Sequence, residues 1–466
     1  MLLLLHGITA SLTHEADLDD AAPSLPMAER TALAGPPALP SSGCGQPLPY
    51  PVGIPSHVTL PLADPLLYNP YRDVYIYLPA GFDNTVPLPI VYSFHGFYSS
   101  ALVKMNDDRF MWKNKILASK NLTGFIAVHP SGMADSGTQE GYSPSAPGNP
   151  ESTWNVWGQS QSPGPRGHTC DQHRKRFGRY GCYTSCRARA NTTLHSGCFQ
   201  KMNENISGHD KCHASTCAND TLFMDTLFKK LDSTLCIDRR RNYATGMSVG
   251  GMMALWMAVR FNTRFAAAVP VAGSALIGFW QPPALPIAIM DIHGTEDATI
   301  PANQSNGFIA LGNHSTGKPM VVPGCPECGF SDDGYYYTPN YNITRDIAEV
   351  NGLPCTRFGA QCVVKVYPTP YYGLEIGTRA KWTCFQSFGA PAAANVISKN
   401  GGATEVLPVV RCTWKGKHFQ PIHGDQGATT RFEKHRFFSN IFWDFVSRYA
   451  IQPGSEKEDR LLLELE

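Results

Sequence analysis

The segment RNYATGMSVGGMMALW, residues 241–256, constrains the fold of this chain more than any other. Residues Asn242 to Thr245 predict a short strand, and the apolar run from Gly251 to Phe261 predicts a helix. Between them stands Ser248, with a glycine two residues before it and another two residues after it. Glycines at such a junction let the backbone take a strained turn that holds a serine side chain above a sheet. The segment therefore predicts a strand, a tight serine turn and a helix.

The rest of the chain repeats this alternation of strand and helix. Apolar or alternating runs predict further strands at Tyr71–Leu78, Leu88–Phe94, Gly124–Val128, Ala266–Val271, Pro286–Ile292 and Leu407–Trp414. Helical patterns are found at 109–119, 221–234 and 432–449. The order of elements indicates an α/β fold, with a mainly parallel central sheet flanked by helices.

The organisation that we expect is one large domain with shorter flanking segments. Residues 1–20 begin with MLLLLHGITAS, which has the apolar run of a signal peptide but lacks its basic start. Residues 21–70 are rich in Pro, Ala and Ser and predict an irregular segment. The domain itself covers 71–450, and the charged tail 451–466 is expected to be peripheral.

A cysteine-rich insert interrupts the domain at about 158–218. It holds six of the fourteen cysteines, and we interpret it as an excursion cross-linked by disulfides. Zinc binding is the alternative, on Cys182, Cys186, His195, His209 and His213, but no paired CxxC pattern is present there. The single CxxC, Cys325 to Cys328, has no thioredoxin-like context and predicts a structural bridge.

The cysteines and the glycosylation sequons together indicate an oxidising, extracellular compartment. Seven sites match the N-glycosylation pattern: Asn121, Asn191, Asn205, Asn219, Asn303, Asn313 and Asn342. We therefore expect a secreted, disulfide-bonded glycoprotein. The net charge of +1 gives no general attraction to nucleic acid, and no later stretch reaches the about 18 apolar residues of a membrane span. The sequence does not indicate an oligomeric state.

The serine turn acquires a chemical meaning from residues farther along the chain. A serine hydroxyl becomes a nucleophile when a histidine removes its proton and a carboxylate orients that histidine. In α/β-hydrolases these residues occur in the order Ser, Asp or Glu, His. Asp297 comes just after a predicted strand and is the expected acid. Glu296 is second choice, and Asp291 is discounted because it lies within the strand. His418 and His423 are both candidates for the base, on the loop before the last helix.

Two backbone N–H groups are the expected partners of a developing oxyanion. One belongs to Val249, directly after the serine, and the other to Phe97, in the turn His95-Gly96-Phe97 after an early strand. The aromatics Trp154, Trp157, Phe279 and Trp280 are candidates to line an acyl or aryl pocket, although packing in the core is the favoured interpretation. This chemistry needs neither a cofactor nor a metal.

A series of short motifs resembles one esterase family. They are YLPAGFD, LPIVYSFHG, TWN, LCIDRRRNYATGMSVGGMM, VPVAG, IHGTED and RCTWKGKH, in this order. The chain thereby resembles the polyhydroxybutyrate depolymerases and the feruloyl and acetylxylan esterases, which are α/β-hydrolases, from about Tyr71 to Tyr449. The cysteine-rich insert and the loop-rich stretch before Leu407 depart from the compact members. The resemblance implies hydrolysis of a carboxylic ester through an acyl-enzyme, with a polysaccharide-linked ester or a polyester as substrate.

The resemblance also favours one of the two histidines. Family members run from a strand through a short Gly-Gly-His motif to a later proline, and the residues from Cys412 to His418, with Pro421 beyond them, are similar. Lys417 stands where a second glycine is usual, so His423 remains the alternative. Two other interpretations stay open: a non-catalytic secreted carbohydrate-binding or interaction protein on a hydrolase scaffold, and a serine peptidase.

Overall fold

The computed structural model describes most of the predicted domain and part of its N-terminal flank. The described residues are 35–62, 71–97, 99–133, 152–158, 218–275, 279–295, 297, 299–302, 329–330, 336–353, 363–366, 382–387, 396–397, 403–404, 407–414, 417–418 and 431–463. The interior of the cysteine-rich insert, both cysteines of the CxxC motif and His423 lie outside these residues.

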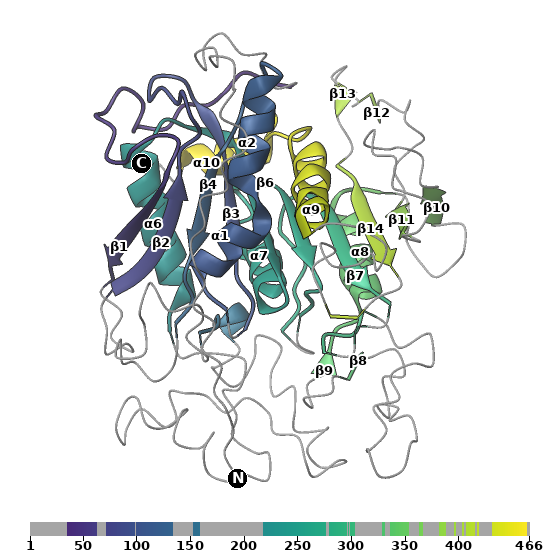
Figure 1. Ribbon diagram of the computed structural model, residues 1–466. Helices are drawn as coiled ribbons and strands as arrows, with labels where there is room; N and C mark the ends of the chain where they lie inside the picture. Colours follow the sequence, from purple (N-terminus) through teal and green to yellow (C-terminus); the bar gives the residue numbers. More distant parts are fainter. Residues whose placement is uncertain are drawn as a thin grey trace, which may run out of the picture.

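A ten-stranded sheet forms the centre of the described structure (Figure 1). Its strands run in the order β1-β2-β4-β3-β5-β6-β7-β14-β11-β10. In this order they are Pro55–Pro61, Tyr71–Tyr77, Ile126–Pro130, Leu88–Phe94, Ile237–Met247, Phe265–Val271, Ala288–Gly294, Val409–Trp414, Trp382–Ser387 and Val363–Val366. Two small antiparallel pairs lie apart from it: β8 with β9 (Gly329–Phe330 and Tyr336–Tyr337), and β12 with β13 (Val396–Ile397 and Ala403–Thr404).

The middle of the sheet is parallel and its two edges are antiparallel. Strands β4, β3, β5, β6, β7 and β14 pair in parallel. Strands β1 and β2 on one side, and β11 and β10 on the other, add antiparallel pairs. The predicted α/β-hydrolase fold with a mainly parallel sheet is confirmed.

Helices cover both faces of this sheet (Figure 1). One face carries α1 (Ala101–Asp108), α2 (Phe110–Ser119) and α9 (Arg431–Val446), and the other carries α6 (Asp220–Thr234), α7 (Val249–Arg260) and α8 (Asn340–Val350). A short 3-10 turn, η3 (Val156–Gly158), contacts α7. None of the described helices is long and apolar enough to cross a bilayer.

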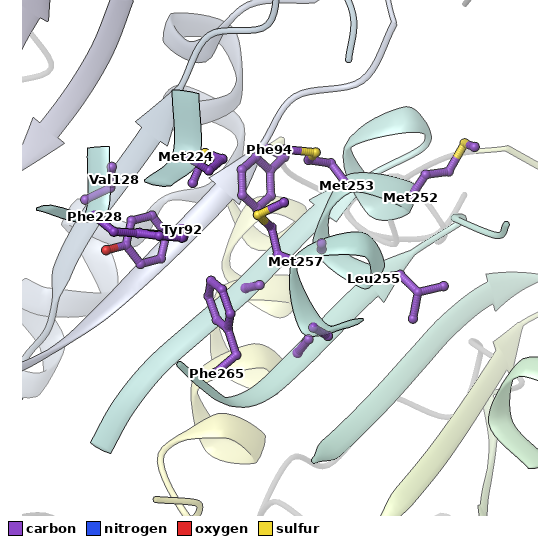
Figure 2. Packing of buried hydrophobic residues seen from close by; sticks show 14 of the residues in the cluster. Tyr92, Phe94, Val128, Met224, Phe228, Met252, Met253, Leu255, Met257 and Phe265 are labelled. Atoms are coloured by element: carbon purple, nitrogen blue, oxygen red, sulfur yellow. The ribbon is translucent and has the colours of Figure 1, made fainter. Parts of the chain in front are cut away.

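The central strands are apolar on both faces because both faces are covered. On β3, Tyr92 and Phe94 belong to the cluster beneath α6 and α7, whereas Val91 belongs to the cluster beneath α2 and α9. In the first cluster the ring of Tyr92 meets Phe228 and Phe265 edge to face, at centroid distances of 5.1 and 5.8 Å (Figure 2). The contact with Phe228 packs α6 against β3, and the contact with Phe265 joins β3 to β6 within the same cluster.

The expectation of an irregular segment over 21–70 does not hold for residues 55–61. Residues 55–61 form β1, which pairs with β2 along its whole length. Two prolines at its ends hide the strand in the sequence, but an edge strand tolerates proline because it has only one hydrogen-bonded neighbour. A disulfide from Cys44 to Cys236 also joins this segment to the start of β5.

The charged tail is likewise more than a peripheral end. Residues Glu456–Leu463 form helix α10, whose Leu461 is fully buried. Nζ of Lys457 donates to the carbonyl oxygen of Pro286 at 2.9 Å, and Glu458 forms an ion pair with Arg240 near the start of β5. Charged residues that suggested a solvent-exposed tail, Lys457 and Glu458, therefore bind the tail to the domain.

Replacement of both Cys44 and Cys236 by alanine should lower the free energy of unfolding by about 2–4 kcal/mol. The bond closes a loop with a sequence separation of 192 residues, so its loss gives the unfolded chain much more freedom. Guanidinium denaturation of non-reduced protein measures the change, and peptide mapping of the wild type should find the two cysteines linked. An unchanged unfolding free energy would contradict this role.

Candidate active site

Ser248 occupies the turn between β5 and α7. Its backbone has φ 61° and ψ −128°, a conformation that is costly for a residue with a side chain. The turn is held from outside, because the N–H of Ser248 donates to the carbonyl oxygen of Val271 on β6 at 2.9 Å. The hydroxyl makes no cap bond to its own helix, so it is available to other partners.

Two glycines make this turn possible through close approach of backbones. A Cβ on Gly250 would clash with the carbonyl oxygen of Phe94 and come within 2.6 Å of that of His95. A Cβ on Gly246 would clash with the carbonyl of Gly250 itself. The serine turn therefore packs directly against the end of β3, and only glycine fits at both positions.

Asp297 comes after β7 and is fixed by backbone donors. Its Oδ1 accepts from the N–H groups of Thr299 at 3.0 Å and Ile300 at 2.8 Å. Burial alone would raise the pKa of this carboxyl, but hydrogen bonds and charges from His293 and His418 outweigh burial and lower the pKa to about 2. Asp297 is therefore a buried, oriented carboxylate at neutral pH.

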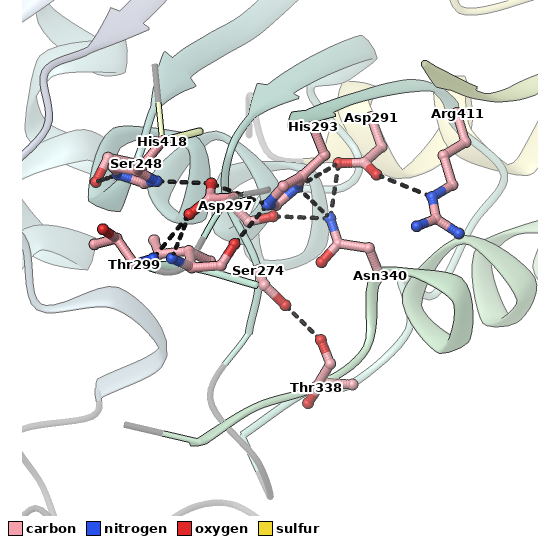
Figure 3. A network of polar contacts seen from close by, with 12 residues as sticks. Ser248, Ser274, Asp291, His293, Asp297, Thr299, Thr338, Asn340, Arg411 and His418 are labelled. Atoms are coloured by element: carbon pink, nitrogen blue, oxygen red, sulfur yellow. Dashed lines mark hydrogen bonds and ion pairs between the residues drawn. The ribbon is translucent and has the colours of Figure 1, made fainter. Parts of the chain in front are cut away.

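His418 joins the serine to this carboxylate (Figure 3). Its Nδ1 lies 2.8 Å from Oδ2 of Asp297, and its Nε2 lies 2.7 Å from Oγ of Ser248. The three side chains come from the carboxyl ends of β5, β7 and β14, which are separated in sequence but lie close together in the sheet. Glu296, the second choice for the acid, and His423, the alternative base, lie outside the described residues.

A second histidine contacts the same carboxylate, and no sequence motif assigned it a role. His293 is fully buried, with Nε2 3.4 Å from Oδ2 of Asp297 and 2.6 Å from the carbonyl oxygen of Ile300. Its Nδ1 lies 3.7 Å from Oδ1 of Asp291. Burial would lower the pKa of His293, but the two carboxylates raise it to about 9. The sequence did contain a sign of this contact. Asp291 and His293 are two residues apart on a buried strand, so their side chains lie on the same face of the sheet.

Asp291, discounted as the acid, serves this second network. Its Oδ1 accepts from Nδ2 of Asn340 at 2.8 Å, and its Oδ2 lies 3.8 Å from Nε of Arg411 (Figure 3). Nδ2 of Asn340 also lies 3.0 Å from Nδ1 of His293. Two carboxylates near the carboxyl end of β7 thus share His293 and otherwise have different partners.

The loop after β3 lies beside the serine. A Cβ on Gly96 would come within 3.3 Å of Cβ of Ser248 and 3.9 Å of its Oγ. Phe97 is the next residue in this loop, while Val249 is the first residue of α7. Of the two residues expected to supply oxyanion donors, Val249 therefore follows Ser248 in the chain, and Phe97 follows the glycine that contacts Ser248.

The four candidate pocket aromatics are all buried in the core cluster: Trp154, Trp157, Phe279 and Trp280. Nε1 of Trp154 donates to the carbonyl oxygen of His95 at 2.9 Å, and Nε1 of Trp280 donates to Asp346 at 2.8 Å. These contacts favour the core-packing interpretation. Among the described residues no cluster of three His, Cys, Asp or Glu could hold a metal ion.

Three of the seven sequon asparagines fall on described residues. Asn219 is exposed and its side chain accepts from the N–H of Leu222, which caps α6. Asn121 and Asn342 are half-buried. The remaining four lie outside the described residues: Asn191, Asn205, Asn303 and Asn313.

The Asp297 carboxylate should make the stability of the protein depend on pH in the acid range. Its pKa of about 2 lies below the ordinary value of 3.8, so its contribution to the unfolding free energy is present well above pH 4 and is lost as pH falls toward 2. The shift corresponds to about 2 kcal/mol. Urea denaturation of wild type and Asp297→Asn at several pH values between 6 and 2.5 measures it. A difference between the two proteins that does not shrink on acidification would contradict the assignment.

Comparison with known proteins finds similarity centred on hydrolases. The model of the prolyl oligopeptidase family matches residues 218–281. A probable feruloyl esterase C of Aspergillus clavatus is 28% identical over 123 residues, which are 26% of this chain and 45% of the relative. Feruloyl esterase C of Emericella nidulans is 33% identical over 100 residues, which are 22% of this chain and 36% of the relative. The chain thus matches less than half the length of each of these curated relatives.

Among solved structures, the match to an acetyl xylan esterase from Aspergillus awamori covers 82% of this chain and 99% of that one, at 15% identity and a TM-score of 0.35. The order of the strands and the serine turn between β5 and α7 are those of an α/β-hydrolase fold. The similarity to feruloyl esterases comes from the curated relatives. The chain has the α/β-hydrolase fold and resembles the feruloyl esterases of Aspergillus clavatus and Emericella nidulans.

Proposed function

We propose that this chain is a serine hydrolase of carboxylic esters. The observation that carries the proposal is the position of His418, with one ring nitrogen 2.7 Å from Oγ of Ser248 and the other 2.8 Å from Asp297. Both distances lie within hydrogen-bond range, and the order of the three residues in the chain is that of α/β-hydrolases. The similarity to feruloyl esterases supports an ester as the substrate.

The reaction proceeds through an acyl-enzyme. Oγ of Ser248 attacks the ester carbonyl carbon while Nε2 of His418 takes the hydroxyl proton. Asp297 holds the imidazole in the required tautomer and stabilises the imidazolium. The backbone N–H groups of Val249 and Phe97 donate to the oxyanion. His418 then protonates the leaving alcohol, activates a water that attacks the acyl-enzyme, and returns the proton to Ser248 as the acid leaves.

The substrate class is proposed as an aromatic or acetyl ester, linked to a polysaccharide or within a polyester. Feruloyl esterase similarity favours the aromatic acyl group. A serine peptidase is the second candidate, supported by the prolyl oligopeptidase match over 218–281. That match spans the strand, turn and helix around Ser248, which ester and amide cleavage both require. A panel of methyl ferulate, aryl acetates, acetylated xylan, short polyhydroxybutyrate and a prolyl peptide discriminates between them.

Secretion as a glycoprotein is part of the same proposal. It is supported by the seven sequons, by the fourteen cysteines and by the Cys44–Cys236 disulfide, since such bonds persist in oxidising compartments. Asn219 is an exposed acceptor on a described surface. Glycopeptide mapping after expression through a eukaryotic secretory pathway tests it, and unmodified sequons with reduced cysteines would count against it.

Removal of the nucleophile or the base should abolish turnover while the fold persists. Ser248→Ala should lose ester hydrolysis and covalent labelling by a fluorophosphonate together. His418→Ala should lose several orders of magnitude in kcat, because proton transfer fails in both acylation and deacylation. The matched control is His423→Ala, which should stay within about tenfold, or about 1.4 kcal/mol of barrier. Circular dichroism checks the fold of each variant.

Two results would reject parts of this proposal. A wild-type protein that is neither labelled nor active on any ester or peptide would favour a non-catalytic carbohydrate-binding or interaction protein. Loss of activity in His423→Ala with retention in His418→Ala would transfer the role of base to His423.

A further inference from the structure

His95 lies in the loop after β3, is fully buried, and has no part in the reaction steps of the triad. Its Nε2 is 2.8 Å from the backbone nitrogen of Gly132, which can only donate a hydrogen bond. Nε2 must therefore be unprotonated and accept. The ring proton of neutral His95 then sits on Nδ1, which lies 2.8 Å from the carbonyl oxygen of Gly96 and donates to it.

This bond orients the peptide that joins Gly96 to Phe97. In a trans peptide the C=O and the N–H point in opposite directions. Because the Gly96 carbonyl is drawn toward the imidazole, the N–H of Phe97 must point away from it. Gly96 itself lies against Ser248, as its close approach to Cβ of Ser248 indicates.

The preceding peptide is fixed as well. The carbonyl oxygen of His95 accepts from Nε1 of Trp154 at 2.9 Å, and the imidazole lies against the indole with ring centroids 5.1 Å apart. Two successive carbonyl groups of the loop are thus hydrogen-bonded: that of His95 to Trp154, and that of Gly96 to the side chain of His95.

We propose that His95 is a positioning residue, whose Nδ1–H holds the Gly96 carbonyl so that the N–H of Phe97 is aimed at the oxyanion of the reaction. This inference rests on the proposed function and adds to it the group that orients one of the two oxyanion donors. It also explains why a histidine, rather than an apolar residue, occupies a fully buried position in this loop.

The surroundings keep His95 in the required neutral form. Burial lowers its pKa most, the bond to Gly96 raises it, and the cations Arg72 of β2 and Lys104 of α1 lower it further, to about 4. The other polar groups that face the ring are the Gly132 N–H and the hydroxyl of Ser152, 3.5 Å from Nε2. These contacts within the described part of the chain include no carboxylate that would stabilise an imidazolium at neutral pH.

Two amide substitutions separate positioning from mere packing. In His95→Asn the side-chain amide nitrogen occupies the place of Nδ1 and can still donate to Gly96. In His95→Gln the amide oxygen reaches the place of Nε2 and can still accept from Gly132, but no donor faces Gly96. We expect His95→Gln to lose about 10²-fold in kcat with KM nearly unchanged, because a displaced oxyanion donor affects the transition state alone. His95→Asn should keep kcat within about tenfold of the wild type, a range that the same kinetic comparison measures.

A boronate inhibitor that forms a tetrahedral adduct on Ser248 supplies an independent readout. Its affinity should fall in His95→Gln in parallel with kcat, and should be retained in His95→Asn. Equal losses in the two variants, or a greater loss in His95→Asn, would overturn the inference. Both variants are measured beside wild type and Ser248→Ala. An inactive wild type would overturn the proposed function and this inference with it, whereas an active wild type with indistinguishable His95 variants overturns this inference alone.

The wild-type protein provides a test that does not depend on the folding of a variant. NMR of protein with ¹⁵N-labelled histidine should show one neutral imidazole, assigned to His95, that keeps its proton on Nδ1 between about pH 5 and 8, since its pKa lies near 4. A proton on Nε2, or an imidazolium in this range, would overturn the proposed role.

Discussion

The close approach of two backbones, at the end of β3 and at the start of α7, is the contact on which the site depends. Gly250 faces the carbonyl oxygens of Phe94 and His95 at a separation that admits no side chain. The serine turn and the loop after β3 are thereby held in a fixed relative position by contacts between main-chain atoms. Ser248 can hold its strained φ because this packing and the bond to Val271 leave it no alternative.

Two buried histidines near Ser248 show how the neighbouring groups of an imidazole determine its pKa. His95 and His293 are both fully buried, yet the pKa of one is lowered to about 4 and that of the other is raised to about 9. The first contacts backbone groups and faces cations, whereas the second lies between the carboxylates of Asp291 and Asp297. The two surroundings thus favour a neutral imidazole in the loop after β3 and a protonated imidazole beside Asp297.

Much of the fold could be predicted from the sequence, because its central strands are apolar on both faces and its serine turn has a specific glycine pattern. Strand β1 could not, since two prolines interrupt its signal and its pairing with β2 is an edge contact. Helix α10 was hidden by charges that bind Pro286 and Arg240. For the site, residue order and turn context suggested Ser248 and Asp297, but the choice between His418 and His423 depended on a family resemblance. The raised pKa of His293 could not be predicted from its position alone, because it arises from the carboxylates of Asp291 and Asp297, which the folded chain brings to the buried ring.

The disulfide between Cys44 and Cys236 has a consequence for the integrity of the chain. It ties the segment before β1 to the start of β5, the strand that leads to Ser248. A single proteolytic cut anywhere between the two cysteines leaves both pieces covalently joined, so neither can diffuse away. Under non-reducing conditions a nicked molecule keeps the mass of an intact one apart from the water added. In oxidising surroundings such a nick separates the two pieces only after the bond itself is reduced.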